Sequence, residues 1–105
     1  MGDLLKNAHK IRKQIDSVQT DLKDRVVEGE AGDGAVKVLV NGQQDILKLS
    51  IKPSIVSSDP DDVELLEDLI LAAINQGMEK SRELKNSEIN QVTGGLGDSL
   101  SGLFF

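Results

Sequence analysis

Apolar residues near the N-terminus recur at alternating spacings of four and three positions. They are Leu4, Ala8, Ile11, Ile15, Val18 and Leu22. This spacing places them in one narrow stripe along an α-helix, of the kind that packs against a second helix. The pattern therefore predicts a helix over residues 4–24 that pairs with another helix along this seam. The plainer alternative is a single helix packed on a core.

After residue 25 the apolar pattern changes to every second position. Valines occupy alternate positions of residues 36–40, and leucine or isoleucine occupies alternate positions of residues 47–51. Such alternation is typical of half-buried strands. Asn41-Gly42 predicts a hairpin, because a type I′ turn requires two residues that tolerate positive φ. The predicted strands of this antiparallel meander are residues 25–30, 35–41 and 46–51.

A second, longer helix is predicted to begin at Asp59-Pro60. Asp suits the cap position, Pro suits the first helical position, and acids in the first turn complement the helix dipole. The helix is predicted to run from Pro60 to about Val92, or roughly 50 Å at 1.5 Å per residue. Its first half is apolar on nearly all sides and is expected to be buried between the sheet and another element. Beyond Gly77 the helix is mostly polar and is expected to project from the core.

The order helix, three strands, long helix predicts an α+β fold. Aromatic residues make up 2% of the chain and are confined to Phe104 and Phe105, so the core must consist of aliphatic side chains. A short chain with so thin a core is expected to complete it with a second copy, as an intertwined homodimer. The first helix, about 30 Å long, exceeds what a three-stranded sheet covers, so helical arms are expected to project. Residues 1–93 are expected to form the domain, and residues 94–105 a flexible, Gly-rich tail.

Charge is distributed unevenly along the chain. The net charge is −6, which by itself argues against a nucleic-acid partner. Residues 1–27, however, hold six bases against four acids, whereas residues 59–75 hold six acids and no base. The absence of cysteine excludes disulfides and thiolate metal sites. No stretch has the pattern of a signal peptide or a membrane span, so the protein is expected in the cytoplasm.

Several spaced motifs, in order, resemble the YbaB/EbfC family of nucleoid-associated proteins over nearly the whole chain. They are Val26-Val27-Glu28-Gly29-Glu30-Ala31-Gly32-Asp33-Gly34, Val36-Lys37-Val38, Asn41-Gly42, Ile51-x-Pro53-Ser54 and the apolar run 65–75. The resemblance implies a homodimer with joined sheets and tweezer-like helical arms that bind DNA in the bacterial nucleoid. The first helix departs from the Met-rich form common in the family, but its Leu, Ile and Val preserve the seam. The tail is Gly-rich where the family often has Pro and Met, which leaves its role open.

Two groups of basic residues are the candidate DNA contacts. Lys6, Lys10 and Lys13 share one helical face opposite the apolar seam, and Arg12 lies at the flank of the seam, where Asp16 is a possible partner. The second group is Lys80, Arg82 and Lys85, on the projecting half of the long helix. For the first group the alternative is an ordinary solvated face. For the second it is ion pairing with the neighbouring glutamates.

No helix-turn-helix, zinc-finger or basic-zipper pattern is visible, and no aromatics interleave with the bases. DNA binding through backbone and shape, with low sequence specificity and strong salt dependence, is therefore expected. His9 is the single histidine, and no phosphate loop or calcium-loop spacing occurs, so we expect no enzyme activity, cofactor or metal. The alternatives are an acidic dimeric chaperone or protein-binding adaptor, and a structural partner of a recombination or replication factor.

Overall fold

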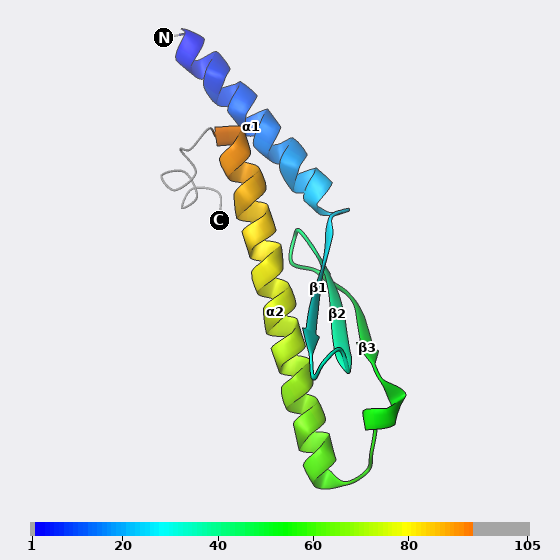
Figure 1. Cartoon of the computed structure of the whole chain (residues 1–105). Helices are drawn as coiled ribbons and strands as arrows, with labels where there is room; N and C mark the ends of the chain where they lie inside the picture. The colour runs from blue at the N-terminus through cyan, green and yellow to red at the C-terminus, as the bar shows by residue number, and fades with distance from the viewer. Residues whose placement is uncertain (1, 94–105) are drawn as a thin grey trace.

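A computed structural model describes the backbone of residues 2–93 and the side chains of residues 8–91. The elements are α1 (Gly2–Leu22), β1 (Val26–Ala31), β2 (Val36–Asn41), β3 (Ile46–Ile51), the 3₁₀ turn η1 (Pro53–Ile55) and α2 (Pro60–Thr93). Figure 1 shows this order, which confirms the predicted α+β fold. The η1 turn was not predicted. The tail over residues 94–105 lies outside the described residues.

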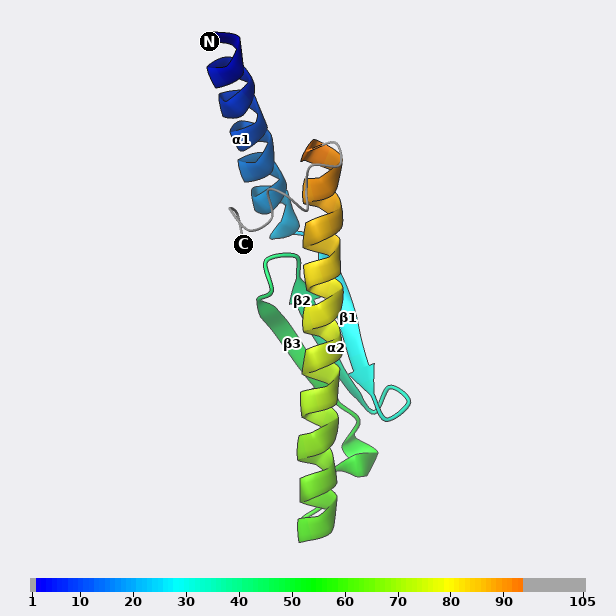
Figure 2. The same ribbon diagram turned by 90° about the vertical axis from the view of Figure 1, so that its left-hand side faces the viewer.

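The three strands form one antiparallel sheet in the order β1-β2-β3. Helix α2 runs along one face of it, as Figure 2 shows. The alternation in β2 is confirmed, because Val36, Val38 and Val40 are fully buried and form the core together with Ala73 of α2. The other side chains of β2 up to Leu39 point to the opposite, outer face.

Two glycines allow α2 to lie directly on β1. A Cβ atom at Gly29 would meet the carbonyl oxygen of Ala73 and come within 2.5 Å of the backbone nitrogen of Gly77. A Cβ atom at Gly77 would in turn lie 2.8 Å from the Val40 side chain. The missing side chains thus set the spacing between helix and sheet, and a larger residue at either position would force the two layers apart.

The hairpin between β2 and β3 forms as predicted, but the reason given for it was wrong. Neither Asn41 nor Gly42 has positive φ; the left-handed residue is Gln44, with φ 65°. The Asn41 side-chain oxygen instead accepts hydrogen bonds from the backbone N–H groups of Gln43 and Asp45, each at 3.0 Å. Gly42 is needed for close packing, because a Cβ atom there would lie 2.6 Å from the side chain of Leu22 at the end of α1.

The predicted start of α2 is confirmed. The Asp59 carboxylate accepts a hydrogen bond of 2.8 Å from the backbone N–H of Asp61, and the Asp59 carbonyl accepts the first helical bond, from Val63. Pro60 occupies the first helical position. This cap satisfies an N–H group that would otherwise have no partner within the helix.

Helix α1 leaves the sheet and lies beside the C-terminal part of α2 (Figures 1 and 2). Ile15 and Leu22 on the seam of α1, and Ile89 on α2, are each only 1% exposed. The predicted helix-pairing seam is therefore confirmed, and its partner is the α2 helix of the same chain. We call α1 together with residues 79–93 of α2 the arm.

The chain is elongated, with extents of 68 × 22 × 17 Å and a radius of gyration of 18.6 Å. A compact domain of this length has a radius of gyration of about 13 Å. The expectation that the first half of α2 is buried on all sides is wrong within one chain, because Leu65 is 56% exposed and Leu71 59% exposed. The sheet covers only one side of this half of the helix, and no second element among residues 2–93 covers the others.

Candidate nucleic-acid interface

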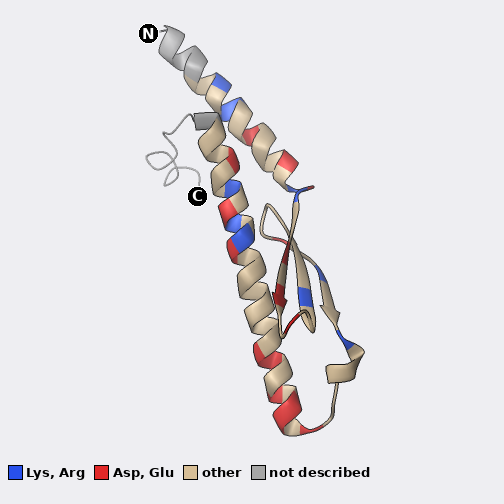
Figure 3. Cartoon of the chain, viewed as in Figure 1, with Lys and Arg blue, Asp and Glu red and all other residues tan. Residues whose placement is uncertain are grey.

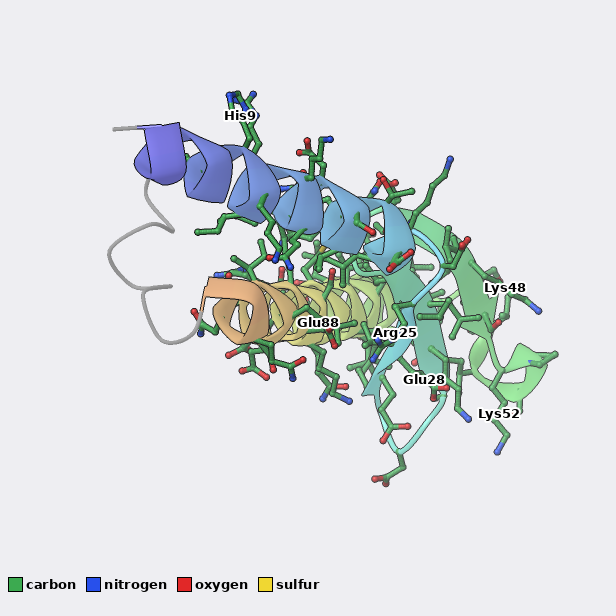
Figure 4. The ribbon with its side chains drawn as sticks, turned by 90° about the horizontal axis from the view of Figure 1, so that it is seen from above. His9, Arg25, Glu28, Lys48, Lys52 and Glu88 are labelled. Carbon is green, nitrogen blue, oxygen red and sulfur yellow. The ribbon has the colours of Figure 1, made fainter. Side chains whose placement is uncertain are left out.

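The basic residues of α1 lie on the outward face of the arm. Lys10, Arg12 and Lys13 are exposed, and none of them forms an ion pair with another described residue. Because Ile15 faces α2, helical geometry turns Lys10 and Lys13 to the opposite side. Figure 4 shows the neighbouring His9 pointing away from α2. The side chain of Lys6 lies outside the described residues.

Arg12 does not pair with Asp16 in this structure, although both side chains are exposed. Arg12 is one position from Lys13 and so projects from the flank of α1, nearer to the seam. Its guanidinium therefore has solvent rather than a carboxylate beside it. The outward face of α1 thus carries cations that no described acid holds in an ion pair, with Asp16 as the acid nearest in sequence.

The basic residues of α2 do not form one surface. Lys80 donates a hydrogen bond of 2.9 Å from its Nζ atom to the backbone carbonyl of Glu28 in β1. Arg82 is exposed and lies roughly 200° further round the helix, at about 100° per residue. Lys85 is half-buried and has a partner of its own. Of the three, Arg82 is the residue best placed to reach a ligand in solvent.

The alternative for this second group was ion pairing with glutamates of the same helix. Lys80 forms no such pair with a described residue. Its ammonium group instead reaches across to the edge of the sheet. Nearby, the Gln76 side-chain oxygen accepts a hydrogen bond of 2.8 Å from the backbone N–H of Glu30. Lys80 and Gln76 thus satisfy two backbone groups on the outer edge of β1.

Arg25, at the base of the arm, was not among the predicted site residues. Its Nη1 atom lies 3.4 Å from the Glu88 carboxylate of α2, and Figure 4 shows the two side chains next to one another. This ion pair connects the start of β1 to the C-terminal half of α2. No sequence pattern indicates it, because the two residues are 63 positions apart.

Negative charge is concentrated at the end of the molecule opposite the arm, as Figure 3 shows. Residues 59–68 hold six acids and no base, so this segment carries a charge of −6. The net charge of the whole chain is also −6, so the charges of the remaining residues sum to zero. Asp62 and Lys85 are about 35 Å apart along α2 at 1.5 Å per residue. That separation is several times the Debye length of about 8 Å at physiological salt, so the acids barely affect the potential at the arm.

The described residues include no group of three or more histidines and carboxylates arranged to hold a metal ion. Among the same residues, no helix has both the length and the apolar character needed to cross a membrane.

These features define a small α+β module with one covered sheet face and a two-helix arm that presents cations to solvent. The profile of the YbaB/EbfC DNA-binding family matches residues 1–96, and the chain belongs to this family. A protein of Acetivibrio thermocellus named as a nucleoid-associated protein is 47% identical over 99% of this chain and 89% of its own length. One of the same description from Ruminiclostridium cellulolyticum is 44% identical, over 99% and 88%.

The fold also has a counterpart among solved structures. The crystal structure of an uncharacterized protein from Helicobacter pylori superposes with a TM-score of 0.73, covering 88% of this chain and 96% of that one. At 24% identity this likeness establishes the fold alone. It agrees with the arrangement of helix, three-stranded sheet and long helix described above.

Proposed function

We propose that this protein is a nucleoid-associated protein that binds double-stranded DNA as a homodimer, through the arms and with low sequence specificity. Membership of the YbaB/EbfC DNA-binding family is the observation that carries the proposal. The exposed Lys10, Arg12 and Lys13 on the arm supply the chemistry, because unpaired cations gain most from contact with phosphates. Lys6, by its spacing, extends the same face.

The arm favours contacts with the DNA backbone over reading of bases. The apolar side of α1 is occupied by α2, so only one polar face of the helix is available to a ligand. Lysine ammonium groups on that face are point charges that suit phosphates and carry little base preference. Affinity should therefore depend steeply on salt and weakly on sequence.

The second copy is inferred from the free edge of the sheet. β3 is an edge strand, and no described element lies along its outer side. The opposite edge, in β1, is covered by Gln76 and Lys80. An uncovered edge strand with apolar side chains promotes association, and proteins usually cover it. Pairing of β3 with its copy would join the two sheets into one.

An apolar surface beside β3 supports the same interface. Leu49 pairs with Val38 in the register and so faces the α2 side, yet it is 45% exposed because α2 packs against β1 and β2. Leu47, where the register between β2 and β3 shifts, is 52% exposed, and Leu71 of α2 is 59% exposed. Full burial of an exposed leucine stabilises by about 1.5–3 kcal/mol, so covering these half-exposed side chains contributes roughly half of that each. A second copy would cover this surface and extend the thin core.

The proposal is tested by the affinity for random-sequence duplex DNA, measured by fluorescence anisotropy from low to physiological salt. We expect binding that weakens steeply with salt. The variant Lys10→Ala/Lys13→Ala removes two phosphate contacts per chain, so the slope of log K against log salt should fall by about 2 per protomer. A duplex of different sequence should give a similar affinity.

The matched control is Lys37→Ala/Lys52→Ala, which removes the same charge from exposed positions on or beside the sheet. If affinity follows total charge alone, both variants will weaken binding equally, and the assignment of DNA contact to the arm is wrong. If the wild-type protein binds no duplex even at low salt, the proposed function itself is wrong.

A further inference from the structure

A pocket of about 260 Å³ lies between η1 and the N-terminal half of α2, at the end of the molecule opposite the arm. Its lining is mainly apolar and consists of Ser54, Ile55, Ser57, Asp62, Leu65, Leu66 and Leu69. Leu65 is 56% exposed at the pocket, and Val56, which follows the lining residue Ile55 in the chain, is 61% exposed. The described chain leaves these side chains uncovered.

This pocket lies on the side of α2 that faces away from the proposed dimer interface. Leu65 and Gln76 are eleven residues apart, close to three full turns, so they share one side of the helix. Gln76 binds the edge of β1, so Leu65 lies on the β1 side of α2. Leu71 is two residues from Ala73, which packs against the sheet, so it lies roughly 200° further round α2 and points away from the sheet. A second copy docked at β3 would leave the pocket open.

Carboxylates border the apolar lining. Asp62 is part of it, and Asp61 and Asp68 lie on the same stripe as Leu65 because they are four and three residues away. Compensation of the helix dipole accounts for acids in the first turn only, since the effect falls off within that turn. Asp68 is two turns further along, exposed, and in no ion pair with a described residue.

We propose that this surface binds a basic, amphipathic segment of a partner protein, with apolar side chains in the pocket and lysines or arginines against the acidic rim. Complementarity of charge selects this occupant. Duplex DNA is repelled by the rim. The arm of another copy is unsuitable, because the seam of α1 is buried against α2 and its basic face offers no apolar stripe. Arm and pocket, at opposite ends, would let one molecule hold DNA and a basic protein together.

The test uses the full chain and a fluorescent helical peptide of lysine and leucine with amphipathic spacing, with binding followed by anisotropy. We expect binding that weakens with salt. Leu65→Ser should weaken it about tenfold, as for a central interface residue. Asp62→Asn/Asp68→Asn should weaken it about fivefold and reduce its salt dependence. Glu79→Gln/Glu83→Gln removes the same charge from the arm half of α2 and should leave peptide affinity unchanged.

Duplex DNA affinity and the far-ultraviolet circular dichroism of each variant are measured in parallel. Unchanged helicity and DNA affinity in the Leu65→Ser protein, with lost peptide binding, would support a separate site. The inference is overturned if the peptide does not bind, if a lysine-only peptide binds equally well, or if the Glu79/Glu83 variant loses as much affinity as the Asp62/Asp68 variant. DNA binding is read independently, so failure of this inference leaves the proposed function standing.

Discussion

Ser81 is a single polar residue whose burial depends on one hydrogen bond. Its hydroxyl is fully buried on α2 and donates a bond of 2.6 Å to the carbonyl oxygen of Asn41, at the end of β2. Ser81→Ala would remove this bond, while the Asn41 carbonyl keeps the backbone N–H of Gln44 as a second donor at 3.0 Å. The expected cost is therefore that of one hydrogen bond, about 0.5–1.5 kcal/mol. Chemical denaturation should show this loss, whereas Ser87→Ala, at an exposed position of the same helix, should cost little. Equal stability of the two variants would show that water replaces the serine.

Lys80 shows how far a residue's role depends on its neighbours. Its position among glutamates on a projecting helix fits either a DNA contact or an ion pair within the helix. In the structure its ammonium group instead donates a hydrogen bond to the backbone carbonyl of Glu28. Lys10 and Lys13, by contrast, lie on the outward face that their spacing predicts, because the seam of α1 fixes which side of that helix is turned inward.

Among the elements, β1 and β3 are both edge strands, but side chains of α2 bind the outer backbone groups of β1 and not those of β3. Gln76→Ala/Lys80→Ala removes the two side chains that cover the backbone of β1. We expect this variant to form species larger than the dimer, because two open edges permit continued strand addition whereas one permits a closed pair. Light scattering over a range of protein concentrations measures the molar mass of these species. Glu79→Ala/Arg82→Ala, at exposed positions of the same helix, is the control, and an unchanged mass of the Gln76/Lys80 variant would contradict the role given to the two side chains.

At the scale of the whole molecule, the proposed dimer depends on the apolar surface beside β3. Leu49→Lys/Leu71→Lys should convert the dimer to monomer, because two charges per chain would be placed in a water-excluded interface. Sedimentation equilibrium measures the mass. Val26→Lys is the control, since Val26 is 50% exposed but lies on the outer sheet face. A dimer that survives the double change would place the interface elsewhere, and a monomeric wild-type protein would refute dimerisation itself.

The same monomeric variant tests whether dimerisation strengthens the binding of duplex DNA. Two arms joined in one molecule engage DNA together, so the second contact benefits from a raised effective concentration. We expect the Leu49→Lys/Leu71→Lys protein to bind duplex DNA more weakly than the dimer, although its arm is intact. Affinity equal to that of the wild type would show that one arm is sufficient.

By itself the sequence determined the elements and their order, because periodicity, caps and turn residues act over short distances along the chain. The seam of Ile15 and Leu22, the cap at Asp59 and the alternating valines of β2 were all recognisable for this reason. The sequence also indicated the outward position of Lys10 and Lys13, which follows from the seam on the same helix.

Only the tertiary structure decided what depends on the approach of distant segments. It showed that α1 pairs with α2 of its own chain, that Gly42 makes room for Leu22 and not for a type I′ turn, and that Lys80 covers the edge of the sheet. Among the described residues it also left the edge of β3 and the pocket beside η1 uncovered. The physical reason is that a helix presents all its sides to solvent until packing fixes which of them is covered, and local sequence does not encode that choice.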